Sequence, residues 1–262
     1  MDSVNWEVGF LRQLRGTMDR DCITVVSNDW LNNIHFLDRQ DSIDIRFRKL
    51  PHWSQPGTLA FITWRTADSM PREVFLQFRK KRFALIRNAG ADPETHWQTA
   101  LAKQAPQALH QVELELFETW DRYLDACEGA CVLRQSEMIS IVAESLIRFN
   151  HDRYLITDYI VMPNHIHIIA AFDREDRMLL QGTSWKRFTG RAINQKLRRT
   201  GKFWQPDQVD HLIRDELHFE YYRNYIRNNP MKAKLNLPSE AYYSFDCSRL
   251  SPRGALDEPR ET

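Results

Sequence analysis

The sequence has 262 residues, of which 42% are hydrophobic, 27% charged and 11% aromatic. This length allows one large domain or two small ones, and the composition excludes wholesale disorder and fibrous repeats. Thirty-six Lys and Arg against 35 Asp and Glu leave a net charge of +1, so a polyanion site would need local charge separation. No apolar run approaches the ~18 residues that span a bilayer, and acidic residues occupy the N-terminus where a signal peptide would be apolar. The four cysteines are scattered and form no disulfide framework. Together with the missing apolar run, they predict a cytoplasmic protein without membrane partners.

The first half of the chain combines an irregular start with one strand and several helices. Residues 1–47 are polar and aperiodic, which predicts a partly ordered extension, and we expect ordered structure to start after Pro51. Residues 58–66 (TLAFITWRT) are β-rich and apolar on both faces, which predicts a central strand. A helical insertion at about 72–150 should follow, since helical periodicity recurs at 72–87, 107–126 and 136–149, the last with Ser136 as a candidate N-cap.

The second half alternates strands and helices. Residues 154–161 and 165–172 should pair as a hairpin, because Pro163 and Asn164 between them favour a turn. Beyond the hairpin we expect a helix at 178–199, a short strand pair within 203–214, and a helix over 216–228 that must end near Pro230. The C-terminal residues, 241–262, are predicted to form a disordered tail.

Charge is distributed unevenly along the chain. Residues 178–202 contain seven Lys and Arg and no acidic residue, whereas residues 92–128 carry eight acids and two basic residues. A basic run alone is more often a solvated helix face. Here aromatic residues interleave with the cations, a mixture that suits the phosphates and unstacked bases of single strands. The candidate DNA-binding residues are Trp185, Lys186, Arg187, Arg191, Lys196, Arg198 and Trp204.

Two histidines stand in the second strand of the predicted hairpin. Side chains alternate along a strand, so His165 and His167 point to one face while Ile166 points to the other. Neutral imidazole suits several divalent metals, but two ligands do not complete a site. Without further residues, such a pair is a polar sheet face in most proteins.

A second cluster lies in the last predicted helix, in the run YYRNYIRNNP. Tyr225 and Asn229 are four residues apart and share a helix face, so a phenol and an amide oxygen could meet the same metal or phosphate. Tyr222 also lies on the face of Asn229, so spacing leaves the choice of tyrosine open. A core-facing aromatic helix capped by Asn before Pro would give the same pattern.

Five stretches of the chain, between about residues 50 and 237, read in order LPHWSQPGTLAFITWRTADSMP, YLITDYIVMPNHIHIIAAF, SWKRFTGRAINQKLRRTGKFWQ, DHLIRDE and YIRNNPMKAKL. Their MPNHIHI and YIRNNP blocks are more specific than His-x-His or Tyr-x3-Asn alone. Through these stretches the sequence resembles the REP-associated tyrosine transposases. These are single-tyrosine enzymes of the HUH endonuclease superfamily, which is named for its His-hydrophobic-His motif.

The resemblance implies an α+β fold, with a ferredoxin-like antiparallel sheet and helices in a domain over residues 48–240. It implies a transposase that cleaves and rejoins single-stranded DNA, at repeat hairpins, through a covalent 5′-phosphotyrosine intermediate. Tyr225 matches the family's nucleophile, while His165, His167 and Asn229 match its metal site, which would hold Mg²⁺ or Mn²⁺. The partner would be single-stranded DNA or a DNA hairpin, and the active form a monomer or homodimer. The N-terminal extension and the helical insertion depart from the family pattern.

Two other interpretations stay open. The chain could be a non-catalytic DNA-binding protein or repressor that keeps the fold without turnover. It could also be an RNA-binding module with a basic sheet, which would need neither Tyr225 nor His165. Covalent trapping on single-stranded DNA would separate the transposase from both.

Overall fold

The computed structural model describes residues 28–47 and 51–245, so the predictions for residues 1–27 and 246–262 fall outside the described residues. Its main element is a five-stranded sheet with strand order β6-β3-β5-β4-β7, in which every neighbouring pair is antiparallel. The strands are β3 (Ala60–Arg65), β4 (Tyr154–Val161), β5 (His165–Phe172), β6 (Val209–Leu212) and β7 (Tyr242–Ser244). The order of β6, β3, β5 and β4, with helices after β3 and β5, is that of a ferredoxin-like sheet. The predicted α+β fold class is confirmed.

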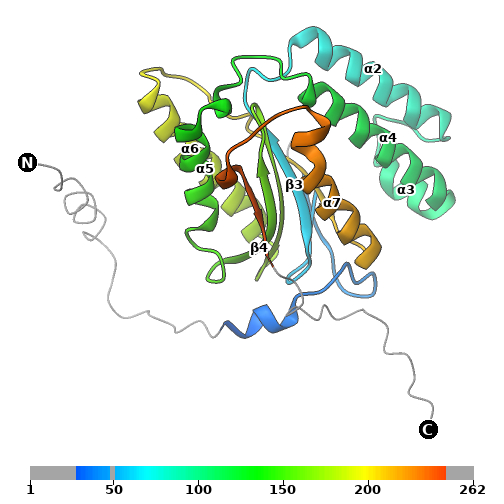
Figure 1. Cartoon of the computed structure of the whole chain (residues 1–262). Helices are drawn as coiled ribbons and strands as arrows, with labels where there is room; N and C mark the ends of the chain where they lie inside the picture. The colour runs from blue at the N-terminus through cyan, green and yellow to red at the C-terminus, as the bar shows by residue number, and fades with distance from the viewer. Residues whose placement is uncertain (1–27, 48–50, 246–262) are drawn as a thin grey trace, which may run out of the picture.

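Helices cover both faces of this sheet (Figure 1). On one face lie α5 (Ser136–Ile147) and α6 (Arg177–Lys196), and on the other lies α7 (Glu216–Lys232). Because side chains alternate along β3, this strand packs against the helices on both faces of the sheet. Trp64 stacks on Trp185 of α6 with ring centroids 5.8 Å apart, whereas Phe61 stacks on Tyr222 of α7 at 4.1 Å.

The predicted helical insertion between the first two sheet strands contains α2 (Arg72–Asn88), α3 (Trp97–Gln104), α4 (Pro106–Asp125) and the short η2 (Val132–Arg134) before α5. Helices α2, α3 and α4 share a small core of their own, made of Ile86, Trp97, Leu101 and Val112. Phe117 of α4 belongs instead to the main core, where it contacts Phe61 edge-on. This anchor places α4 on the α7 side of the sheet (Figure 1).

The described part of the extension is ordered earlier than predicted. It forms η1 (Asn28–Asn33) and β1 (Asp44–Phe47), and β1 pairs with β2 (Pro51–Ser54). Ile34 and Phe36 are buried in the main core, which explains why this polar segment packs on the domain. The extension comes close to the backbone of Gly57, where a Cβ would meet the Asn33 carbonyl oxygen at 2.7 Å. The φ of Gly57 is +76°, so glycine is required at this position for both reasons.

Two predicted helix ends also need correction. The N-cap of α5 is Gln135 rather than Ser136, and no side chain caps this helix. Helix α7 continues through Pro230 to Lys232, because a proline in the last turn removes one hydrogen bond without blocking the two residues after it.

The segment 203–214 contributes one strand, β6, whose partner is β3 and not a second strand of its own. The start of the predicted tail is ordered too, since η3 (Ser239–Ala241) and β7 add an edge to the sheet beside β4. The division of the chain into extension, domain and tail stays a prediction.

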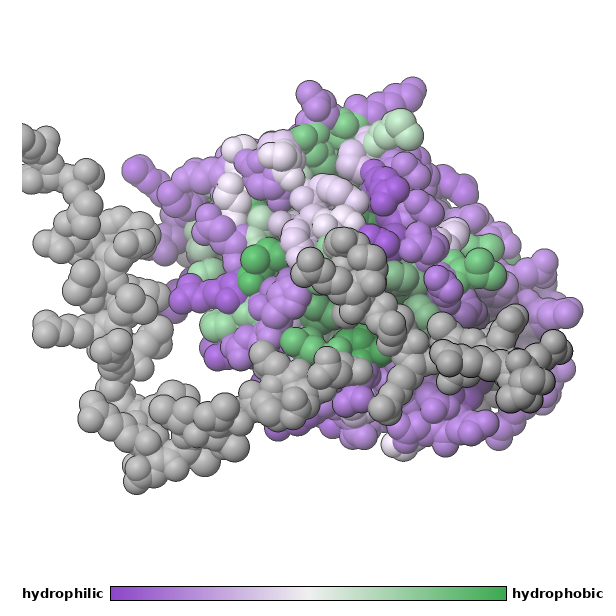
Figure 2. Space-filling view, turned by 60° about the horizontal axis from the view of Figure 1, so that its bottom comes forward, coloured by the Kyte–Doolittle hydropathy of each residue, from purple (hydrophilic) through white to green (hydrophobic). Residues whose placement is uncertain are grey.

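Among the described helices, none combines the length and the apolarity that a membrane-spanning segment needs. The face seen in Figure 2 is mostly hydrophilic, with apolar side chains in several small patches.

Candidate functional site

Strand β5 presents both histidines on the α7 face of the sheet. His165 is 0% exposed and His167 is 1% exposed. The Nδ1 of His165 donates to the Asn164 side-chain oxygen at 2.8 Å, and the Nδ1 of His167 hydrogen-bonds the Thr63 hydroxyl at 2.7 Å. These partners orient both rings, as outer-shell groups do for metal-binding imidazoles. Each ring therefore turns its Nε2 away from these partners.

The Nε2 of His165 is buried and has no hydrogen-bond partner among the described residues. Burial, followed by the nearby His167, lowers the pKa of His165 well below its ordinary value of 6.5, so its imidazole is neutral. A buried nitrogen with a free lone pair is costly unless something binds it. The neutral imidazole is also the form that coordinates metals.

Helix α7 brings Tyr225 and Asn229 to the same place. The helix begins with a capped turn, in which the Asp215 carboxylate accepts from the backbone N–H of His218 at 2.7 Å. Two turns later the Tyr225 hydroxyl lies 3.4 Å from the Nε2 of His167. Asn229 is 1% exposed, and neither its side-chain oxygen nor its nitrogen has a partner in the described structure. Strand β5 and helix α7, which carry the predicted site residues, therefore both have buried polar side-chain atoms without a partner.

The three tyrosines of α7 have different surroundings. Tyr222 is 5% exposed and packs flat on Phe61, so its ring belongs to the core. Tyr221 is 42% exposed. Tyr225 is half-buried between the rings of Phe117 and His167, at centroid distances of 5.1 and 5.2 Å. Its hydroxyl is therefore the tyrosine oxygen that lies beside the histidine pair.

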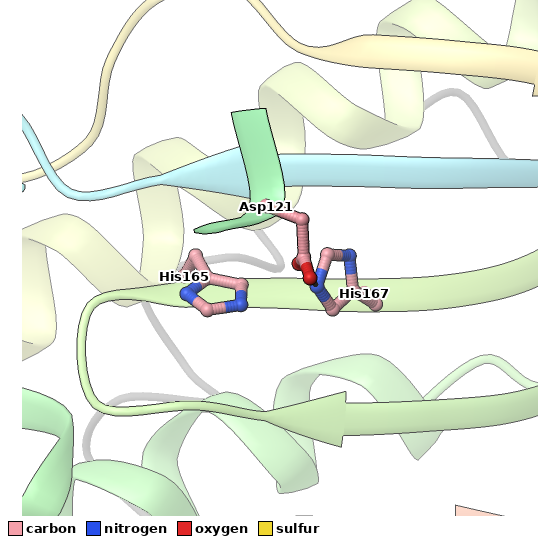
Figure 3. Close-up of side chains that lie close together, drawn as sticks. All are labelled: Asp121, His165 and His167. Atoms are coloured by element: carbon pink, nitrogen blue, oxygen red, sulfur yellow. Dashed lines mark ion pairs between the residues drawn. The ribbon is translucent and has the colours of Figure 1, made fainter. Parts of the chain in front are cut away.

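One further residue, Asp121 of the inserted helix α4, completes this cluster. Its carboxylate accepts a hydrogen bond from the Tyr225 hydroxyl. The same carboxylate lies 3.6 Å from the Nε2 of His167 (Figure 3). It also pairs with the Lys232 ammonium at 2.8 Å, and it is 1% exposed. One ligand atom each from Asp121, His165 and His167 lie within 4.8 Å of one another, so this group could hold a divalent metal ion.

The charges of the cluster are interdependent. Burial opposes ionisation of Asp121, but hydrogen bonds and attraction from His167 and Lys232 hold the pKa of Asp121 well below its ordinary value. Burial and the charge of Asp121 raise the pKa of Asp125 to about 6. The same two causes, burial first, raise the pKa of Tyr225 well above its ordinary value of 10. The phenol is therefore neutral and donates to an ionised carboxylate.

The inserted helix also closes the site. His165, His167, Asn229 and Asp121 are each at most 1% exposed. Phe117 and Asp121, one turn apart on α4, both contact Tyr225. A substrate would reach these side chains only if α4 moved.

The basic segment lies apart from this cluster, on α6 and the loop after it. It borders an open groove of about 830 Å³ whose lining includes Arg187, Arg191, Arg199 and Lys202. Arg187, Arg191, Lys196 and Arg198 are exposed, as DNA-binding residues need to be. Lys196 is already paired with Glu137.

Three of the predicted DNA-binding residues have other roles here. Trp185 is 2% exposed against Trp64, and Trp204 is 5% exposed with its indole N–H donating to Thr189 at 2.8 Å. Lys186 is 9% exposed and donates to the Pro206 carbonyl at 2.7 Å. The prediction that Trp185 contacts DNA is corrected, because its ring is packed in the core against Trp64. Lys186 and Trp204, although mostly buried, belong to the lining of the groove, so their contact with DNA stays a prediction.

Comparison with known proteins adds little to this geometry. No protein-family model matches the sequence, and no curated protein matches it. Among solved structures, the chain is similar to one described as the structure of a REP-associated tyrosine transposase bound to a REP hairpin. The identity is 16% and the TM-score 0.33, over 71% of this chain and 73% of that chain. A likeness this distant carries no functional argument.

Proposed function

We propose that this protein is a metal-dependent tyrosine transposase that cleaves and rejoins single-stranded DNA at repeat hairpins. The observation that carries the proposal is the Tyr225 hydroxyl 3.4 Å from the Nε2 of His167, in a buried site where His165 and Asn229 have unpartnered ligand atoms. The sequence resemblance described above assigns these same four residues. The α+β fold with a ferredoxin-like sheet is compatible with it.

The residues fit a divalent metal. Two imidazoles and an amide, with orphaned atoms on His165 and Asn229, form a donor set that accepts Mg²⁺ or Mn²⁺ at His165, His167 and Asn229. When bound, the ion would polarise the scissile phosphate and offset the charge that develops on it. Thr63 and Asn164 keep the two imidazoles oriented throughout.

In the proposed reaction the Tyr225 oxygen attacks phosphorus. The new bond is a 5′-phosphotyrosine linkage, the P–O3′ bond breaks, and the released strand ends in a 3′-hydroxyl that gains a proton. The proton that leaves the phenol balances the one that the 3′-hydroxyl gains, and in the closed structure this phenol donates to Asp121. The phosphotyrosine conserves the phosphodiester free energy, so a 3′-hydroxyl can reverse the step on another strand without a nucleotide cofactor.

DNA contacts outside the centre are assigned to the exposed cations beside the groove, Arg187, Arg191, Lys196 and Arg198. Phosphate contacts of this kind release counterions and supply affinity without specifying sequence.

The test is covalent trapping. Labelled single-stranded DNA from the repeats flanking the protein's own gene is incubated with the protein and Mg²⁺, and a denaturation-resistant adduct is expected. Tyr225→Phe should abolish the adduct, while Tyr221→Phe, a matched change on the exposed side of α7, should retain it. An adduct that survives in Tyr225→Phe and is lost in Tyr222→Phe would assign the nucleophile to the other tyrosine.

The closed site favours a second candidate, a DNA-binding protein without turnover. Burial of His165, His167 and Asn229 beneath α4 is compatible with a binding protein that never admits a phosphodiester. Hairpin binding without any adduct in Mg²⁺ or Mn²⁺ would support it.

A further inference from the structure

Arg65 is the last residue of β3 and lies on the same sheet face as the histidine pair. In the register of β3 with β5, Arg65 is directly opposite His165, and Thr63 is opposite His167. Side chains of opposite residues in an antiparallel pair share a face, with Cβ atoms about 4.5–5.5 Å apart. The guanidinium is therefore a neighbour of the candidate metal site.

This arginine is held in place by neutral groups. It is 9% exposed, and its Nη1 donates to the Ser69 hydroxyl at 3.0 Å and, more weakly, to the Thr66 carbonyl at 3.5 Å. The half-buried Trp120 ring of α4 lies 5.3 Å from the guanidinium carbon. Among the described residues, no carboxylate forms an ion pair with it. Its planar head is thus oriented while its charge is not neutralised.

Buried cations in proteins are normally paired, because an isolated charge is costly to desolvate. The half-buried Arg223 of α7 follows this rule, with its Nε 3.2 Å from the Asp158 carboxylate. At Arg65 burial lowers the pKa to about 10, and no acidic neighbour opposes the shift. An unpaired cation beside a site that takes a phosphodiester is typical of an anion-binding residue.

We propose that Arg65 binds a phosphate group of the DNA strand at the candidate site. The proposal rests on the proposed function in taking DNA as the ligand, but it does not require cleavage. A guanidinium matches phosphate oxygens with two parallel N–H donors, which a lysine cannot reproduce. Ser69 acts as a positioning residue, because its hydroxyl holds one nitrogen of the fork in place.

The probe is fluorescein-labelled (dT)20, and its binding is measured by anisotropy over a range of KCl concentrations in a Tyr225→Phe background. Arg65→Gln should weaken binding roughly 10- to 100-fold, as expected for losing a charged hydrogen-bond pair. It should also reduce the slope of log K against log salt by about 0.7, the value for one phosphate contact on a single strand. Arg65→Lys should keep the slope and lose part of the affinity. Arg148→Gln, an exposed change beyond α5 on the opposite face, should alter neither.

Thermal unfolding shows whether the Arg65→Gln protein is folded. If it is folded and binds with the parent's affinity and salt slope, the proposal is overturned. If this variant does not fold, Arg65→Lys carries the test, and affinity equal to the parent's would overturn it. The adduct assay remains separate. Adduct formation with an unchanged slope refutes the role of Arg65 alone, whereas a reduced slope without any adduct supports Arg65 and refutes the transposase.

Discussion

Replacing His52 by Gln should remove a pH dependence of stability that originates in one buried imidazole. His52 lies in β2 and is 1% exposed. Its Nε2 is 2.9 Å from the Asp207 carboxylate, and its Nδ1 pairs with Asp210 of β6. Burial alone would lower the pKa, but the hydrogen bonds and attraction of the two carboxylates outweigh it and raise the pKa of His52 from 6.5 to about 9.

The sign and size of the effect follow from this shift. The folded pKa lies above the unfolded one, so the stabilisation is fully present below pH 6.5 and is lost as pH rises through about 9. A shift of this size corresponds to about 3.5 kcal/mol at most, since each pKa unit is worth roughly 1.4 kcal/mol. Between pH 6 and pH 8 the free energy of unfolding should fall by about 2 kcal/mol from this group.

Urea unfolding at pH 6, 7 and 8 measures the loss directly. In His52→Gln the fall between pH 6 and pH 8 should shrink by about 2 kcal/mol, because Gln stays neutral throughout. His110→Gln, an exposed change on α4, is the matched control and should leave the parent's slope intact. If His52→Gln and the parent lose the same free energy over this range, the imidazole is not held as a cation and the reasoning is refuted.

Two further predictions concern the candidate site and the groove. Asp121→Asn should weaken Mn²⁺ binding about 10- to 100-fold by calorimetric titration, because the site loses the carboxylate that pairs with Lys232 and contacts His167, while the exposed Glu118→Gln should not. Equal losses in both variants would contradict a specific role. Arg187→Ala combined with Arg191→Ala should lower the salt slope of single-strand binding by about 1.4 and leave Mn²⁺ affinity unchanged. A slope equal to the parent's would exclude both residues from phosphate contact.

The parts of the fold that depend on local pattern were predictable. The hairpin of β4 and β5 has two largely apolar runs around a Pro-Asn turn, and the structure gives it the predicted bounds. The helix that carries Tyr225 and Asn229 was predicted from its periodicity, although its end was placed before Pro230. Local pattern also placed both histidines on one face, where their Nδ1 partners now hold them.

The parts that depend on tertiary packing were missed. Asp121 was counted within an acidic segment, because nothing local says that α4 folds back onto β5. A signal was present, since Asp121 stands one turn after Phe117 and one turn before Leu124, in the buried stripe of the helix. Trp185 was assigned to DNA because it interleaves with cations, yet on α6 it points to the sheet. Spacing shows which residues share a face and does not show what that face contacts.

The place of α4 leads to the last prediction. Trp120 and Asp121 are successive residues of α4. The Trp120 ring contacts the Arg65 guanidinium, and the Asp121 carboxylate accepts from the Tyr225 hydroxyl, so both groups that a phosphodiester would need are already in contact with α4. Chemistry at Tyr225 therefore requires α4 to move, and hydrogen exchange followed by mass spectrometry can detect the movement. In the Tyr225→Phe protein with single-stranded DNA from its flanking repeats, peptides from 106–125 should exchange faster than without DNA. Peptides from 136–147, on the opposite face, should not change. Adduct formation by the parent combined with unchanged protection of 106–125 would show that the strand reaches Tyr225 without displacing α4.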